Sequence, residues 1–161
     1  MTIRPAAAND LGRIIEIYAI ARDYMRSTGN MSQWAGGYPA QGLLEEDIAK
    51  KQLFVVEDAL GVHGVFAFIL GEDPTYGYIE GRWPNKKPYG TIHRIASDGT
   101  VKGLVTLARD FALSFIDEIR VDTHHDNHTM QHVVKKNGFL PCGVIYLENG
   151  DPRLAYQYSK E

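Results

Sequence analysis

The hydrophobic positions of the first seventy residues follow two different spacings. Apolar residues at helical spacing over Leu11–Met25 predict a helix, and a second, shorter helix is expected around Leu43–Lys50. The apolar runs Leu53–Glu57 and Gly61–Leu70 are bounded by turn residues, so they predict two strands joined by a turn. A short opening strand at Thr2–Arg4 completes this part of the chain.

The rest of the chain alternates predicted strands with predicted helices. Strands are expected at Thr91–Ala96, Glu118–Thr123, Phe139–Tyr146 and Arg153–Tyr158, and helices around Leu104–Phe115 and Met130–Val134. Residues 73 to 89 are rich in turn formers, with Tyr78–Glu80 as a candidate short strand. This order predicts an α/β fold in which helices cover a mixed sheet.

Composition and charge narrow the class of protein. With 161 residues, 44% of them hydrophobic, and no internal repeat, the chain is expected to form a single domain over residues 1–161. A net charge of −3 argues against a nucleic-acid partner. The single cysteine, Cys142, cannot close an intrachain disulfide, which suits a reducing compartment. Without a signal peptide or an apolar run of membrane length, we expect a cytoplasmic protein with no membrane partner.

Two segments of the second half carry motifs. Ile92-His93-Arg94-Ile95-Ala96 is followed by a turn and by Val101-Lys102-Gly103-Leu104, and residues 127–139 begin with Asn127 and end in Lys136-Asn137-Gly138-Phe139. Both segments, and the order of the elements, resemble the GCN5-related N-acetyltransferases (the GNAT family), and one bacterial subgroup in particular. The resemblance covers the whole chain. It implies a mixed, mostly antiparallel sheet with a splayed parallel strand pair, flanked by helices.

The chain departs from the family pattern in two places. The family's phosphate loop usually reads Gln/Arg-x-x-Gly-x-Gly/Ala, whereas Thr100, Gly103 and Val105 occupy those positions here, so only the central glycine is kept. Many members also carry, on the later helix, a tyrosine that protonates the departing thiolate. This chain has Val134 at that position, so another group or water must supply the proton.

The resemblance implies a set of residues that bind acetyl-CoA. The first N–H groups of a helix lack internal partners and carry the positive end of its dipole, so the turn around Lys102 and Gly103 suits a pyrophosphate. In the family, the backbone of the preceding strand pairs with the pantetheine arm and stabilises the oxyanion of the acetyl group. Asn127 is a helix N-cap, a hydrogen-bond partner of the cofactor, or both. The full set is Ile95, Ala96, Ser97, Val101, Lys102, Gly103, Leu104, Val105, Thr106 and Asn127.

The acceptor amine requires a base, because an alkyl amine is protonated at neutral pH. His93 is our candidate, since serotonin N-acetyltransferases, which this segment resembles, have a histidine at the matching position; the alternative is a histidine packed in the sheet. Glu80 is the second candidate, if its short strand faces the cleft. For the proton given to the thiolate, the candidates are Tyr146, Tyr156 and Cys142. We favour Tyr146, on the condition that it faces the strand opening.

Two aromatic residues are candidates for the acceptor pocket. Trp34 and Tyr38 lie among glycines in the loop between the first two helices, where family members bind the acceptor. Their alternative role is to cover the edge of the sheet. The histidines between His124 and His132 raise the question of a metal site, but Thr129 stands where a zinc protease needs its glutamate, so we expect no metal.

The function expected from these residues is the transfer of acetyl from acetyl-CoA directly to a primary amine of a small molecule or peptide. The identity of that amine is not readable from the sequence, and a homodimer is compatible with it. The alternative is a non-catalytic domain of the same fold that senses acyl-CoA or binds a partner protein. Turnover separates the two, because a sensor leaves the thioester intact.

Overall fold

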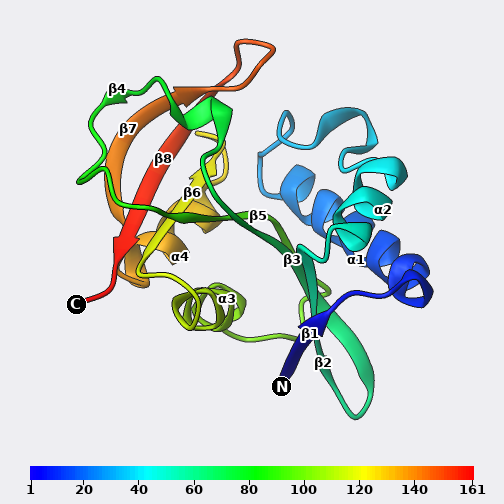
Figure 1. The fold of residues 1–161 in the computed structure, drawn as a ribbon. Helices are drawn as coiled ribbons and strands as arrows, with labels where there is room; N and C mark the ends of the chain where they lie inside the picture. Colours follow the sequence, from blue (N-terminus) through cyan, green and yellow to red (C-terminus); the bar gives the residue numbers. More distant parts are fainter.

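The computed structural model describes residues Met1–Glu161, and one eight-stranded sheet runs through it in the order β1-β2-β3-β5-β6-β8-β7-β4 (Figure 1). The strands are β1 Thr2–Pro5, β2 Leu53–Asp58, β3 Gly61–Leu70, β4 Glu80–Gly81, β5 Gly90–Ser97, β6 Glu118–Thr123, β7 Leu140–Tyr146 and β8 Pro152–Ser159. The helices are α1 Leu11–Ser27, α2 Gln41–Ala49, α3 Leu104–Leu113 and α4 His128–Lys136, with short 3-10 turns at Ala8–Asp10, Ala35–Gly37 and Pro74–Tyr76. No helix is both long enough and apolar enough to cross a membrane.

The predicted sheet is confirmed. All strand pairs are antiparallel except β5 and β6, which are parallel. Strands β3 and β6 begin and end at the predicted residues. The candidate strand Tyr78–Glu80 is wrong in its bounds: β4 is Glu80–Gly81, which pairs with Val144 and Gly143 of β7 at the edge of the sheet.

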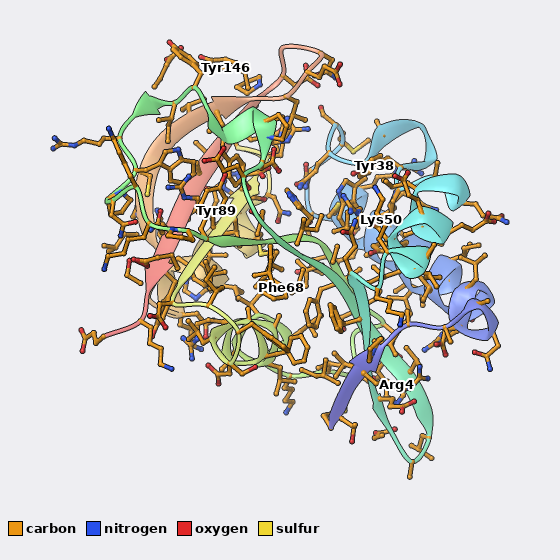
Figure 2. All side chains as sticks on the ribbon, in the orientation of Figure 1. Arg4, Tyr38, Lys50, Phe68, Tyr89 and Tyr146 are labelled. Carbon is orange, nitrogen blue, oxygen red and sulfur yellow. The ribbon has the colours of Figure 1, made fainter.

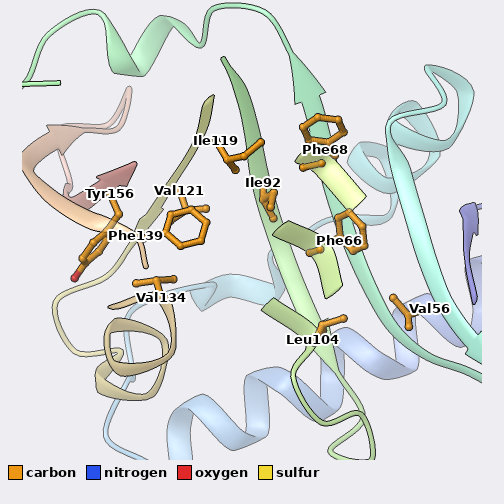
Figure 3. Close-up of a cluster of buried hydrophobic side chains, with 12 residues drawn as sticks. Val56, Phe66, Phe68, Ile92, Leu104, Ile119, Val121, Val134, Phe139 and Tyr156 are labelled. Carbon is orange, nitrogen blue, oxygen red and sulfur yellow. The ribbon is translucent and has the colours of Figure 1, made fainter. Parts of the chain in front are cut away.

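Two helices cover each face of the sheet (Figure 1). On the face of α1 and α2, Ile14, Ile17 and Leu44 pack against inward-facing strand residues in one buried cluster. On the face of α3 and α4, the second cluster contains Leu104, Ala108 and Ala112, which recur every four residues along α3. Figure 3 shows this second cluster, with Val134 of α4 facing Val121 and Phe139.

The parallel pair opens almost as soon as it forms. Only two residue pairs, Gly90↔Ile119 and Thr91↔Arg120, join β5 to β6. Beyond Thr91, the backbone edge of β5 that faces β6 has no strand partner. The predicted splay is therefore present, and it leaves an opening in the middle of the sheet.

A bulge in β5 lies next to this opening. Along the pairing with β3, Val65 lies opposite Ala96 and Ala67 lies opposite His93, so β5 contains one extra residue. Arg94 within the bulge has a φ of 51°, in the left-handed region. The buried hydroxyl of Tyr18 donates to the carbonyl of Arg94 at 2.6 Å and fixes the bulge to α1.

Candidate active site

A cavity of about 600 Å³ occupies the opening between β5 and β6 and reaches both faces of the sheet. Toward α3 and α4 its lining is apolar and comprises Ile92, Ile95, Val105, Val121, Met130, Val134 and Phe139. Its ionisable lining residues are Asp73, His93, Arg94, Asp122, Asp151 and Arg153. The cavity therefore combines an apolar half with a strongly polar half.

His93 lines the cavity and is held by a carboxylate. Its Nε2 lies 3.0 Å from Oδ2 of Asp73, a residue in the turn before β4. Burial alone would raise the pKa of Asp73, but hydrogen bonds from His93 and Thr75 lower that pKa to about 2. Because an ionised carboxylate only accepts hydrogen bonds, Nε2 carries the proton and Nδ1 of the neutral ring keeps a free lone pair. Nδ1 of His93 is thus the ring nitrogen that has no protein partner.

Asp122 is a second carboxylate of the cavity, and it lies near His93. The hydroxyl of Tyr76 donates to its Oδ2 at 2.6 Å. Burial raises the pKa of Tyr76 well above its ordinary value, and the negative charge of Asp122 raises it further, so the phenol stays protonated. The Tyr76 ring also lies 6.3 Å, centroid to centroid, from the ring of His93. Tyr76 therefore holds the carboxylate of Asp122 and lies beside the ring of His93.

The N-terminus of α3 offers a row of free donors. None of the backbone N–H groups from Val101 to Thr106 donates to a protein atom, and the helix begins only with the bond from Leu107 to Gly103. Gly103 precedes the helix with a φ of 70°, a conformation that glycine adopts without strain. The free N–H groups and the helix dipole together suit a pyrophosphate.

The residues that the resemblance assigns to acetyl-CoA are placed in two ways. Ile95, Val105 and Asn127 line the cavity, whereas the side chain of Ala96 packs into the cluster under α1. Ser97 ends β5, and the remaining members belong to the loop before α3 and to its first turn, where they offer mainly backbone groups.

Asn127 is an N-cap, as one of its two interpretations stated. Its Oδ1 accepts from the N–H of Met130 at 3.1 Å, and its Nδ2 donates to Gln33 at 3.1 Å. This second bond ties the start of α4 to the loop after α1. Because Asn127 also lines the cavity, the N-cap and a ligand contact through Nδ2 are compatible.

Trp34 and Tyr38 both line the cavity and also take part in packing. Trp34 meets the ring of Tyr18 at 5.5 Å between centroids and packs against the cluster under α1. Tyr38 is 38% exposed beside α1 and α2, with its hydroxyl 3.4 Å from Arg94 (Figure 2). The two predicted roles of these rings, substrate contact and cover of the sheet, therefore coincide in space.

Tyr146 and Glu80 contact each other, and neither lines the cavity. The Tyr146 hydroxyl donates to the Glu80 carboxylate at the outer edge formed by β4 and β7 (Figure 2). Tyr146 was expected to face the strand opening and Glu80 to face the cleft, and neither residue lines the cavity. Successive side chains point to opposite faces, and it is Leu147, the residue after Tyr146, that lines the cavity. The assignments of Tyr146 as proton donor and of Glu80 as base are corrected accordingly.

The other two candidate proton donors also lie outside the cavity lining. Tyr156 is 2% exposed within the cluster under α3 and α4. The Cys142 thiol donates to the carbonyl of Leu140, and burial raises its pKa. Val134 forms part of the cavity wall, and none of Tyr146, Tyr156 and Cys142 is among the residues that line the cavity.

Only some of the histidines near α4 lie close enough together to share a metal ion. His124, His125 and Asp126 offer ligand atoms within 4.8 Å of one another, whereas His128 and His132 are not in this group. Burial lowers the pKa of His124, and the positive charge of Arg153 lowers it further. A nearby arginine works against binding of a cation at this position.

Three side chains of the polar half were missed by sequence reasoning: Asp73, Asp122 and Arg153. Asp73 lies in a turn-rich segment where no periodicity marks it. Asp122 stands between the buried residues Val121 and Thr123 of β6, and a carboxylate in such a strand was the available signal. Arg153 is 9% exposed, and nothing in the sequence marks it as buried.

Comparison with solved structures gives close matches over the full chain. An acetyltransferase of the GNAT family from Streptococcus agalactiae is 32% identical, with a TM-score of 0.89, over 99% of this chain and 95% of that chain. A GNAT-family acetyltransferase from Listeria monocytogenes, 19% identical, has a TM-score of 0.72 over 98% of this chain and 94% of that one, and this likeness shows the fold alone. No protein-family model matches the sequence, and comparison with curated proteins gives no match. The similarity to the streptococcal enzyme, together with the splayed strands and the free N-terminus of α3, shows that this chain belongs to the GNAT family of acetyltransferases.

Proposed function

We propose that the chain transfers the acetyl group of acetyl-CoA directly to a primary amine, with His93 as the base. The observation that carries this proposal is the pair His93–Asp73: His93 lines the cavity at the opening of the sheet, and its Nδ1 has no protein partner. A histidine held in this way suits removal of a proton from an ammonium ion near neutral pH.

The residues divide the work between the two halves of the cavity. The free N–H groups from Val101 to Thr106 would hold the pyrophosphate, and the unpaired edge of β5 would pair with the pantetheine arm. Acetyl-CoA supplies the acetyl group as a thioester. On the polar side, His93 takes one proton from the acceptor ammonium, and Asp73 stabilises the imidazolium. Overall a C–S bond breaks and a C–N bond forms; one ammonium proton ends on the sulfur and the other in solvent.

Calorimetric titration of acetyl-CoA, followed by an amine screen for thiol release, tests the two parts of the proposal in turn. Saturable binding at one site per chain supports the cofactor half, and thiol release with an amine supports transfer. Binding without turnover for any amine would favour an acyl-CoA sensor instead, in keeping with Val134 at the usual tyrosine position. Absence of binding would contradict both.

Replacing His93 tests the base directly. His93→Ala removes the proton acceptor but leaves the turn before α3 intact, so we expect kcat to fall by about 100-fold or more with acetyl-CoA affinity nearly unchanged. Steady-state kinetics and calorimetry measure the two effects. His132→Ala is the matched control, since His132 is exposed on α4 and has no hydrogen-bond partner. An unchanged kcat in His93→Ala would remove His93 from the mechanism.

A further inference from the structure

Arg153, at the start of β8, is a buried cation of the cavity whose charge no acidic group balances. The residue is 9% exposed, and Nη1 donates to the Pro152 carbonyl at 2.8 Å. Nε and Nη2 donate to no protein atom, and neither is among the fully enclosed polar atoms that lack a partner. Both groups are therefore accessible and unpaired in a residue that lines the cavity.

The other basic side chains of the lining already have acidic partners. Arg94 contacts Asp47 at 2.7 Å, and His93 contacts Asp73 at 3.0 Å. A buried charge without a partner is costly, so an arginine kept in this state fits a site whose partner is an anionic group of the ligand.

Asp122 is the complementary group across the cavity. Its Oδ2 accepts from Tyr76, while Oδ1 has no protein partner and no cation pairs with the carboxylate. Asp122 lies opposite Ala155 in the β6–β8 ladder, and Arg153 projects from the same face as Ala155 because side chains alternate along a strand. Asp122 and Arg153 are therefore diagonal neighbours about 7–8 Å apart on one face. Asp122 and Arg153 form no ion pair with each other. The exposed Asp151 forms no ion pair with Arg153 either, and its carboxylate accepts a hydrogen bond from Asn149.

We propose that the acceptor is an amino-acid-like zwitterion, whose carboxylate binds Arg153 and whose ammonium binds Asp122 beside His93. This inference rests on the proposed amine transfer and names the substrate class. The flat guanidinium fork matches a carboxylate through two parallel hydrogen bonds. Tyr76 contacts Asp122 and lies next to His93, so an ammonium ion on Asp122 is close to the base.

The test compares amino acids with the amines that remain when their carboxylate is removed, using thiol release as the readout. The wild-type chain should acetylate at least one amino acid with a kcat/KM about 10-fold or more above that of its decarboxylated partner. Arg153→Met should raise KM for that amino acid by about 10- to 100-fold and leave the decarboxylated amine and acetyl-CoA binding unchanged. Arg153→Lys keeps the charge without the fork, so it should recover part of the loss.

Arg82→Met is the matched control. Arg82 is exposed and makes no side-chain hydrogen bond, and its substitution removes the same charge. A wild-type preference for the decarboxylated amine in every pair would overturn the inference, and so would a preference that Arg153→Met leaves unchanged. If acetyl-CoA binds but no amine is acetylated, the proposed function fails. The inference is then decided by ligand-observed NMR with the same amino acids: binding lost in Arg153→Met supports it, and no binding to the wild type overturns it.

Discussion

Single aspartates determine what the neighbouring side chains of the site can do. Asp73 fixes the ring of His93 by its Nε2 and so decides which nitrogen is free. Asp47 neutralises Arg94, which leaves Arg153 as the cation available to a ligand. The chemistry of the cavity therefore depends on which aspartate contacts which base, and these contacts join residues that are distant in sequence.

Asp73 also makes a pH-dependent contribution to stability. Its pKa of about 2, below the ordinary value of 3.8, means that its ionised form stabilises the folded chain by about 2 kcal/mol at pH 7. This stabilisation is complete above the unfolded pKa and is lost as the pH falls toward 2. Asp73→Asn should therefore lower the free energy of unfolding by about 2 kcal/mol at pH 7 and by about half as much at pH 3.

Urea unfolding at both pH values measures the two differences. Asp23→Asn serves as the control, since Asp23 is exposed on α1 and makes no ion pair. A difference between Asp73→Asn and wild type that stays constant from pH 7 to pH 3 would contradict the role given to the carboxylate.

Some residues of the site were predictable from sequence and others were not. His93, Ile95 and Asn127 follow from local motifs, because the motif itself fixes their place on the strand or helix. Tyr146 shows the limit: a shift of one residue decides whether a side chain faces the cavity, and Leu147, the first residue after β7, lines it instead. Register is set by strand pairing across the sheet, which a single segment of sequence does not contain.

At the level of elements, α1 and β5 are coupled through one buried hydroxyl. Tyr18 is 1% exposed and donates to the carbonyl of Arg94 in the β5 bulge at 2.6 Å. The bulge lies in the part of β5 that faces the opening, beyond the two residue pairs with β6. A helix on one face of the sheet therefore supports the backbone on which the reaction depends.

Tyr18→Phe isolates this coupling, because it removes the hydroxyl and keeps the ring. The Arg94 carbonyl then loses its partner, so we expect the free energy of unfolding to fall by about 1–3 kcal/mol and kcat to fall with it. Chemical denaturation and steady-state kinetics provide the measurements. Tyr24→Phe should change neither quantity, since the Tyr24 hydroxyl is exposed and meets only Thr129. Equal effects of the two variants would argue against a special role for the bulge.

The predictability of the elements follows from how local their signals are. β3 and β6 were predicted at both ends because apolar or β-branched residues recur along both: β3 carries an apolar run, and in β6 such residues alternate with charged ones. β4 has two residues and depends on its pairing with β7, so no periodic pattern announces it. The splay has no periodic signal either. It was expected only from the resemblance to the GNAT family.

For the whole molecule, the important fact is that one cavity reaches both faces of the sheet. The apolar half lies toward α3 and α4, and the charged half contains His93, Asp122 and Arg153. Two reactants can therefore occupy the cavity at once, one in each half, and meet where the strands separate. Neither has to leave before the other binds.

This arrangement predicts a ternary complex and no acetylated enzyme. Initial rates at varied concentrations of acetyl-CoA and amine should give intersecting double-reciprocal lines, because both reactants are bound together. Intact-mass measurement after incubation with acetyl-CoA alone should show the unmodified chain. Parallel lines together with an added acetyl group on the protein would instead indicate a covalent route, with Cys142 as the first residue to inspect.

The short junction between β5 and β6 also has a mechanical meaning. Only two residue pairs join one half of the sheet to the other. Most of the backbone hydrogen bonds that a continuous sheet would form between β5 and β6 are therefore absent. A ligand with an extended polar backbone can supply them by hydrogen bonding to the bare edge of β5. In that sense we expect the co-substrate to act as an extra strand, so that the sheet would be stiffer while it is bound.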